Sequence, residues 1–283
     1  MTPDEIDFLG ALVRQRSGIV IGRDKAYLIE NRLAPLAAQR KLAGVSALVG
    51  RLRSARDEPL EREMVEAMTT NETLFFRDGR PFDLLREKIL PQLTSRRVSG
   101  DRALRIWSAA CSTGQEPYSI AILLAEEGVR LTGWRFSIVA TDIARTVLIK
   151  ARAGIYTQFE VQRGMPIRLL VKYFQQTGTH WELGQAIRGM VEFREHNIVT
   201  DPPPQSSCDL IFCRNLLIYF DEGLKRQVLD KLAGALAPHG VLFLGGAESV
   251  FGVSDRLEPV ADWRGAYRVI DRAAAGRVAA GRR

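Results

Sequence analysis

The chain has 283 residues, of which 46% are hydrophobic and 26% charged, a composition that excludes disorder, collagen or coiled coil as a description of the whole. Its formal net charge is +7, and its three cysteines and three histidines are too few for a disulfide framework or a structural metal site. The acidic N-terminus lacks an apolar signal segment and no stretch is long enough to span a bilayer, so we expect a cytoplasmic protein without membrane insertion.

The first quarter of the chain has the apolar spacing of amphipathic helices, interrupted by short Gly, Pro and Ser breaks. We therefore expect a helical N-terminal domain over residues 1–68. Only Gly18–Ile21 resembles a strand there. Pro35 falls inside a helical pattern and is expected to end one helix or begin another near Leu33.

Charge is concentrated in this domain and at the C-terminus. Nine Lys and Arg residues between Arg14 and Arg53 face only two acidic residues, and the acidic stretch at 57–66 follows. Such a polarised surface suits a partner that carries carboxylates or phosphates, and a solvated helix face explains it equally well. Residues 271–283 form an Arg-rich, low-complexity tail that we expect to be disordered.

Residues 69–83 are expected to link two domains and to lie as a loop over a ligand cleft. Thr69 and Glu72 have the spacing of a capping box, and Phe75 with Phe76 suits an interdomain core. The polar candidates for ligand contact in this segment are Asn71, Thr73 and Arg77.

From residue 84 to residue 270, short apolar runs alternate with amphipathic helical stretches, which predicts an α/β domain with a mostly parallel sheet. The expected strands are 104–107, 136–140, 191–193, 209–212 and 241–244, with 257–260 and 266–270 as an antiparallel edge pair. Residues 175–190 break this rhythm with Gly and turn formers, and we expect a small β-hairpin insertion there.

Ligands of open α/β sheets bind beyond the carboxyl ends of the strands, so the polar residues at those points are the site candidates. The first such turn contains only Gly114 of the three glycines that a dinucleotide fingerprint requires. Glu116 completes a capping box with Thr113, or it pairs with a ligand ammonium. Asp142 either accepts hydrogen bonds from the hydroxyls of a ribose or caps a helix.

The next two strand ends are also polar. The side chain of Asn197 and a neighbouring backbone N–H, at Ile198, have the groups that read an adenine edge. Asp221 has the position of a helix cap. The residues placed where a reacting centre would lie are Arg214, Asn215 and Tyr219.

Several motifs in order resemble the CheR-type chemotaxis receptor methyltransferases, which use S-adenosylmethionine. These motifs are RSGIVI, ENRL, TTNET with FFR, WSAACSTGQEPYSIA, ATDI, ARAGIY and FCRNLLIYFD. The resemblance implies a small all-α domain followed by a class I Rossmann-like methyltransferase domain with a β insertion. It also implies a cofactor-binding set of Asn71, Thr73, Arg77, Glu116, Asp142, Asn197, Ile198, Arg214 and Asn215.

The implied reaction transfers a methyl group to receptor glutamates and releases S-adenosylhomocysteine. A glutamate is ionised at neutral pH, so the reaction needs no general base and depends on positioning. Arg77 and Tyr219 are our candidates for orienting the acceptor oxygen. Receptor helices are the expected partner, the protein is expected to be a monomer, and Arg32, Arg40 and Lys41 are the expected receptor contacts.

The sequence departs from the family pattern at three points. Gln115 replaces the first of two frequent glutamates, and the stretch from Gly245 to Glu248 lacks the usual histidine of a G-H-S-E motif. The insertion at 175–190 looks shorter than in members that dock a receptor pentapeptide, so we expect recognition without that tether.

Two other functions fit parts of the sequence. A nucleic-acid methyltransferase is suggested by the pI of 9.6 and by the run Thr200–Pro204, but this run precedes the fourth strand and lacks the aromatic residue of such motifs. We therefore expect no nucleic-acid partner. A non-catalytic sensor of an adenosyl ligand would need the same binding residues.

Overall fold

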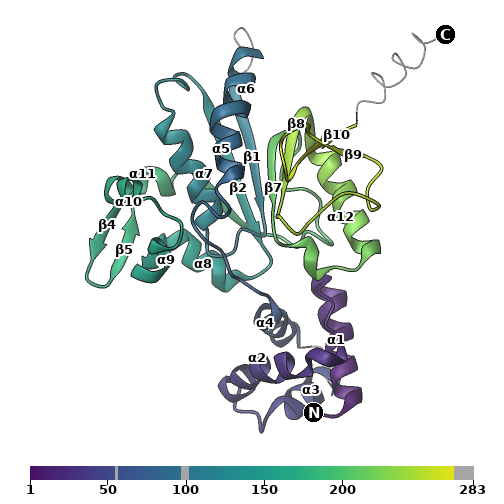
Figure 1. Cartoon of the computed structure of the whole chain (residues 1–283). Coiled ribbons are helices and arrows are strands. Elements are labelled where there is room, and N and C mark those ends of the chain that lie inside the picture. The colour runs from purple at the N-terminus through teal and green to yellow at the C-terminus, as the bar shows by residue number, and fades with distance from the viewer. Residues whose placement is uncertain (55–56, 97–101, 271–283) are drawn as a thin grey trace, which may run out of the picture.

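The computed structural model describes residues 1–54, 57–96 and 102–270 (Figure 1). The predicted tail at 271–283 lies outside the described residues. The first part is helical, with the elements α1 (Pro3–Ser17), η1 (Arg23–Lys25), α2 (Ala26–Gln39), α3 (Val45–Ser54) and α4 (Glu58–Met68). Their apolar stripes meet in a core that includes the fully buried Leu9, Leu33, Leu48 and Met64, which accounts for the helical spacing in the sequence.

The helical part differs from its sequence prediction in two places. Pro35 lies inside α2 and does not end it. A proline costs about 3 kcal/mol in a helix interior, and burial of Ile29, Leu33 and Leu36 on the inner face of α2 offsets this cost. Gly18–Ile21 is an irregular connection and not a strand: its Val20 N–H donates 2.9 Å to the carbonyl oxygen of Tyr219.

The second part is an α/β fold. Its helices are α5 (Arg80–Leu84), η2 (Leu85–Ile89), α6 (Leu90–Arg96), α7 (Gln115–Glu126), α8 (Arg145–Ala153), η3 (Leu217–Tyr219) and α12 (Glu222–Ala235). The strands of its main sheet are β1 (Ala103–Ala109), β2 (Arg135–Asp142), β6 (Val191–Glu195), β7 (Cys208–Cys213), β8 (Leu236–Leu244), β9 (Leu257–Pro259) and β10 (Ala266–Val269).

The seven strands follow the order β6-β2-β1-β7-β8-β10-β9. The first five are parallel, and β10 pairs antiparallel with both β8 and β9, as the sequence predicted. Alternate residues of β1 enter opposite cores, Ile106 on the side of α7 and Trp107 on the side of α12. Helices therefore cover both faces of the sheet (Figure 1). None of the described helices has the length and apolarity of a membrane span.

The insertion between β2 and β6 is larger than a hairpin. It contains β3 (Ile155–Thr157), α9 (Gln158–Gln162), α10 (Ile167–Tyr173), β4 (Phe174–Thr177), β5 (His180–Leu183) and α11 (Gln185–Arg188). The predicted hairpin is β4 with β5, and β3 pairs with the other edge of β5. The sequence prediction missed β3 because three residues next to a helix carry no recognisable alternation.

Several contacts join the helical part to the α/β part. Gly18 ends α1 in a left-handed conformation, and a Cβ added there would lie 2.3 Å from Leu224 Cδ2 of α12. Arg14 of α1 forms a 2.6 Å ion pair with Asp221, which also caps α12 as predicted. These contacts fix α1 against the end of the sheet that carries the polar strand ends.

Candidate functional site

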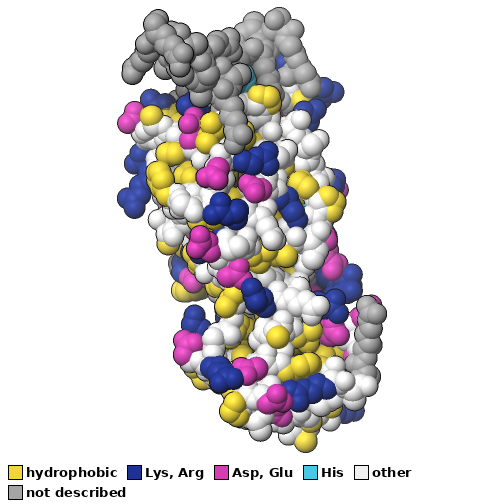
Figure 2. Space-filling view, turned by 90° about the vertical axis from the view of Figure 1, so that its right-hand side faces the viewer, with side chains coloured by type: hydrophobic (Ala, Val, Ile, Leu, Met, Phe, Trp, Pro, Cys, Tyr) yellow, Lys and Arg dark blue, Asp and Glu magenta, His cyan; other side chains and the backbone are white. Residues whose placement is uncertain are grey.

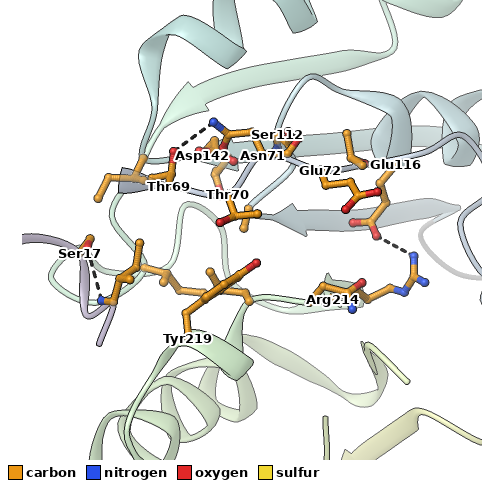
Figure 3. Close-up of a pocket in the computed structure, with 18 of the residues that line it drawn as sticks. Ser17, Thr69, Thr70, Asn71, Glu72, Ser112, Glu116, Asp142, Arg214 and Tyr219 are labelled. Atoms are coloured by element: carbon orange, nitrogen blue, oxygen red, sulfur yellow. Dashed lines mark hydrogen bonds and ion pairs between the residues drawn. The ribbon is translucent and has the colours of Figure 1, made fainter. Parts of the chain in front are cut away.

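A cavity opens at the carboxyl ends of the central strands (Figure 3). Its wall contains all ten residues that the sequence proposed for cofactor binding or catalysis, namely Asn71, Thr73, Arg77, Glu116, Asp142, Asn197, Ile198, Arg214, Asn215 and Tyr219. Sequence positions almost 150 residues apart therefore meet at one edge of the sheet.

The turn between β1 and α7 delivers Glu116. Ala110, Ser112 and Gly114 all have positive φ, so the chain turns sharply before the helix. The predicted capping box of Thr113 and Glu116 is wrong: Gly114 is the N-cap and makes no side-chain cap, and Thr113 donates instead to Gln115.

The Glu116 carboxylate does not cap α7 and instead forms tertiary contacts at the cavity. Its two oxygens accept from Ser108 Oγ at 2.9 Å and from Arg214 Nη1 at 3.1 Å. Glu116 is only 8% exposed. Burial raises the pKa of its carboxyl above the usual range, although the Arg214 guanidinium opposes this shift.

Arg214 connects the sheet to the segment that covers the cavity. Its side chain is 2% exposed, and Nη2 binds both the carbonyl oxygen of Arg77 and the carboxylate of Asp78. An arginine placed between two carboxylates balances the charge that burial of Glu116 introduces. Arg214 is a predicted cofactor ligand, and in the structure it also joins the sheet to the covering segment.

Asp142 lies at the end of β2. Its carboxylate accepts from the backbone N–H groups of Ser112 at 2.8 Å and Ala144 at 3.0 Å. Burial raises the pKa of Asp142 although these N–H groups favour the charged form. Asp142 is not the N-cap of α8, which is Ala144, so the capping alternative does not describe it.

The amides at the start of α8 are instead capped from the helical part. Glu66 of α4 accepts from the N–H groups of Arg145 and Thr146 and from the Thr146 hydroxyl, at 2.9 to 3.3 Å. A carboxylate at a helix N-terminus is electrostatically favourable. This contact fixes α4 beside the end of β2.

The segment between α4 and α5 forms the roof of the cavity. The predicted capping box of Thr69 and Glu72 is wrong, because Thr69 is the C-cap of α4 and its hydroxyl donates to Glu66 O. Ser112 Oγ holds the roof at the carbonyl oxygen of Asn71, at 2.8 Å. Phe75 is not interdomain core: it lies within the α/β part, edge-on to Tyr156 at 5.0 Å.

The helical part supplies one wall. Asn197 Nδ2 donates 2.6 Å to the carbonyl oxygen of Arg16 at the end of α1, and Asn197 Oδ1 accepts from Val199 N–H. Ser17 and Ile19 therefore line the cavity. Neither residue was among the sequence predictions, and the segment RSGIVI at 16–21 is the one signal that this stretch returns to the site.

The structure assigns intramolecular partners to two of the three proposed receptor contacts. Arg32 donates to the carbonyl oxygens of Met68 and Thr69, and Arg40 is paired with Glu63. Lys41 is exposed, and its ammonium group has no ion pair or hydrogen bond within the described part of the chain. Positive and negative side chains alternate over the face in Figure 2, which shows no uniformly basic surface on the helical part.

Comparison with known proteins agrees with this architecture. The family model described as "CheR methyltransferase, SAM binding domain" matches residues 71–264, and "CheR methyltransferase, all-alpha domain" matches residues 4–69. Chemotaxis protein methyltransferase 1 of Pseudomonas aeruginosa is 39% identical over 90% of this chain and 94% of its own length. Chemotaxis protein methyltransferase Cher2 of Pseudomonas putida is 38% identical over 92% of this chain and 96% of its own length.

The raised pKa of Glu116 predicts how the stability of the protein changes with pH. A carboxyl with a raised pKa holds its proton more tightly in the folded state, so its contribution to stability is present below its unfolded pKa of about 4.3 and is lost as pH rises through the folded pKa. We therefore expect the unfolding free energy of Glu116→Gln minus that of the unsubstituted protein to increase as pH rises from the unfolded pKa to the folded pKa of Glu116. Urea titrations at a series of pH values measure this difference.

Glu192→Gln is the matched control. Arg194 lowers the pKa of this exposed glutamate. The unfolding free energy of Glu192→Gln minus that of the unsubstituted protein should therefore decrease slightly as pH rises. A Glu116→Gln difference that does not change with pH would contradict the assignment.

Proposed function

The chain belongs to the CheR methyltransferase family, and from this premise we propose that it methylates glutamate side chains of chemotaxis receptors. S-adenosylmethionine is the methyl donor, and the products are a glutamate methyl ester and S-adenosylhomocysteine. The observation that supports this function best is that one cavity brings Glu116, Asp142 and Arg214 together under the segment between α4 and α5.

The residues of the cavity fit the donor. Glu116 and Asp142 are 8% and 6% exposed carboxylates, suited to the ammonium group and the ribose hydroxyls respectively. Asn215 Oδ1 is buried without a hydrogen-bond partner among the described residues, as expected of an acceptor that a ligand donor satisfies. When bound, the donor supplies an electrophilic methyl group on a positively charged sulfur.

The chemistry requires positioning more than proton transfer. An acceptor carboxylate is ionised at neutral pH, so one C–O bond forms while the C–S bond breaks and its electron pair returns to sulfur. Correct alignment of reacting groups contributes roughly 7 to 11 kcal/mol in favourable cases. We propose that Arg77 and Tyr219 provide this alignment for the acceptor oxygen.

Both side chains have free polar groups at the cavity. Arg77 Nη1 donates to Glu72 O at 3.1 Å, and its guanidinium has no other hydrogen bond and no ion pair in the described part of the chain. The hydroxyl of Tyr219 points into the cavity (Figure 3). One lone pair of the acceptor must stay unbound for attack, so a single hydrogen bond from each residue is better than a bidentate clamp.

Methyl transfer from labelled S-adenosylmethionine to a receptor fragment tests the function. We expect base-labile label on the fragment, and replacement of each candidate receptor glutamate by glutamine should identify the acceptors. Label on RNA would instead support a nucleic-acid methyltransferase. Tight binding of the donor without any label would support a non-catalytic sensor.

Arg77→Ala should lower kcat by about 10²-fold or more, because one preorganised donor contributes this much to many transition states. The affinity for S-adenosylhomocysteine, measured by calorimetry, should fall much less if Arg77 acts mainly on the acceptor. Arg80→Ala is a suitable control, since Arg80 lies three residues further on and donates outside the cavity to Asp262 O. A kcat close to the unsubstituted value would remove Arg77 from the mechanism.

The receptor is proposed to contact the helical part at Arg32, Arg40 and Lys41. Because Arg32 and Arg40 have intramolecular partners, Lys41 gives the clearest test. Lys41→Glu should raise KM for the receptor about fivefold, the effect of roughly 1 kcal/mol at an exposed site, with kcat and Tm unchanged. Lys88→Glu, an exposed charge on η2, should change none of them; equal KM values for both variants would contradict the proposed contact.

We propose further that receptor recognition needs no pentapeptide tether. The β4–β5 connection consists of only Gly178 and Thr179, which keeps this part of the insertion small. Calorimetric titration with a C-terminal receptor pentapeptide should therefore give no heat up to about 1 mM, whereas a full receptor fragment should bind. One-to-one binding of the peptide would refute this proposal.

We also propose that the protein is monomeric, is located in the cytoplasm and has no nucleic-acid partner.

A further inference from the structure

Glu248 is a buried carboxylate to which the reaction described above assigns no role. It follows β8 and is 8% exposed. Its carboxylate accepts three backbone hydrogen bonds, from Asn215 N–H at 2.8 Å, Leu217 N–H at 2.7 Å and Gly245 N–H at 2.6 Å. Within the described ranges Glu248 has no ion pair, and its hydrogen-bond donors are these three backbone N–H groups.

These bonds connect two loops at the catalytic end of the sheet. Glu248 N–H closes a turn onto Gly245 O at 2.9 Å, which holds its carboxylate beside the loop that follows β7. That loop carries Asn215, whose φ of +59° is unusual for a residue other than glycine, and then Tyr219. A conformation of this kind persists where neighbouring contacts impose it.

The two loops also touch directly. A Cβ added to Gly245 would lie 2.7 Å from Asn215 Nδ2, 2.9 Å from Asn215 N and 2.8 Å from Glu248 Oε2. Glycine at 245 therefore lets the loop after β8 approach the loop after β7 closely enough for the carboxylate to receive all three N–H groups.

We propose that Glu248 is a positioning residue for methyl transfer: it holds residues 215–217 so that Asn215 faces the donor and Tyr219 faces the acceptor. This inference rests on the proposed function. It assigns the stretch from Gly245 to Glu248 a role that does not require the histidine missing from this chain. Glu248 acts through Asn215 and Tyr219 and does not line the cavity.

Glu248→Gln is the direct test, because it keeps the shape and removes one acceptor. In either orientation of the amide, its NH2 group faces at least one of the three backbone N–H groups. Loss of one hydrogen bond to a charged group corresponds to about tenfold in an equilibrium constant. We expect Kd for S-adenosylhomocysteine to rise about tenfold and kcat to fall by at least as much.

Glu258→Gln is the matched control. Glu258 lies on β9, is partly exposed and pairs with Arg268, far from the loop after β7 in the chain. It should leave Kd and kcat unchanged. A merely structural Glu248 would lower Tm and leave Kd and kcat of the folded enzyme unchanged, and that result would overturn the proposal.

A glycine pair gives an independent test if Glu248→Gln does not fold. Gly245→Ala places a methyl group between the loops, whereas Gly246→Ala meets no atom within 4 Å. Only Gly245→Ala should weaken S-adenosylhomocysteine binding; equal Kd values for the two variants would contradict the inference. If the unsubstituted enzyme binds the donor but does not methylate the receptor, the proposed function is refuted. The role of Glu248 is still tested in that case, because the Kd comparisons do not depend on receptor methylation.

Discussion

Two carboxylates buried at adjacent strand ends are the constraint on which the site depends. Charges removed from water need partners of matching geometry, and a pair of such charges needs them from several directions. Backbone N–H groups of the β1 and β2 turns provide them for Asp142, whereas Ser108 and Arg214 provide them for Glu116. The left-handed residues of the β1 turn and the charge sequence Glu116–Arg214–Asp78 follow from this requirement.

Most of the sheet could be predicted, because apolar runs of the right length alternate with amphipathic helices along the chain. The main errors concern local motifs. Two Thr-x-x-Glu patterns have the spacing of capping boxes, yet Glu116 bonds Ser108 and Thr69 ends a helix. Both threonines bond other sequence neighbours instead, Thr113 to Gln115 and Thr69 to Glu66 O. The spacing also cannot show that Arg214, 98 residues further on, bonds the Glu116 carboxylate. Family resemblance, and not the local pattern, assigned Glu116 and Asp142 to the site.

Charge pairing is harder to predict than the fold. The run of basic residues from Arg14 to Arg53 looks like one surface in the sequence, but several of its members have acidic partners on other helices. Arg16 pairs with Glu61, Arg40 with Glu63 and Arg53 with Asp4. These pairs depend on how the four helices α1, α2, α3 and α4 pack, so counts of charge along a segment overstate the potential that a partner meets.

The bond between Asn197 and the last turn of α1 makes the helical part a wall of the cavity. The two family segments are therefore not independent modules that a gene fusion can exchange freely. On the function proposed above, a chimaera carrying the helices of a relative would change both the proposed receptor contacts and one wall of the cavity. The proposed function then predicts that changes in receptor preference also affect donor affinity, with compensating changes where α1 contacts the segment after β6.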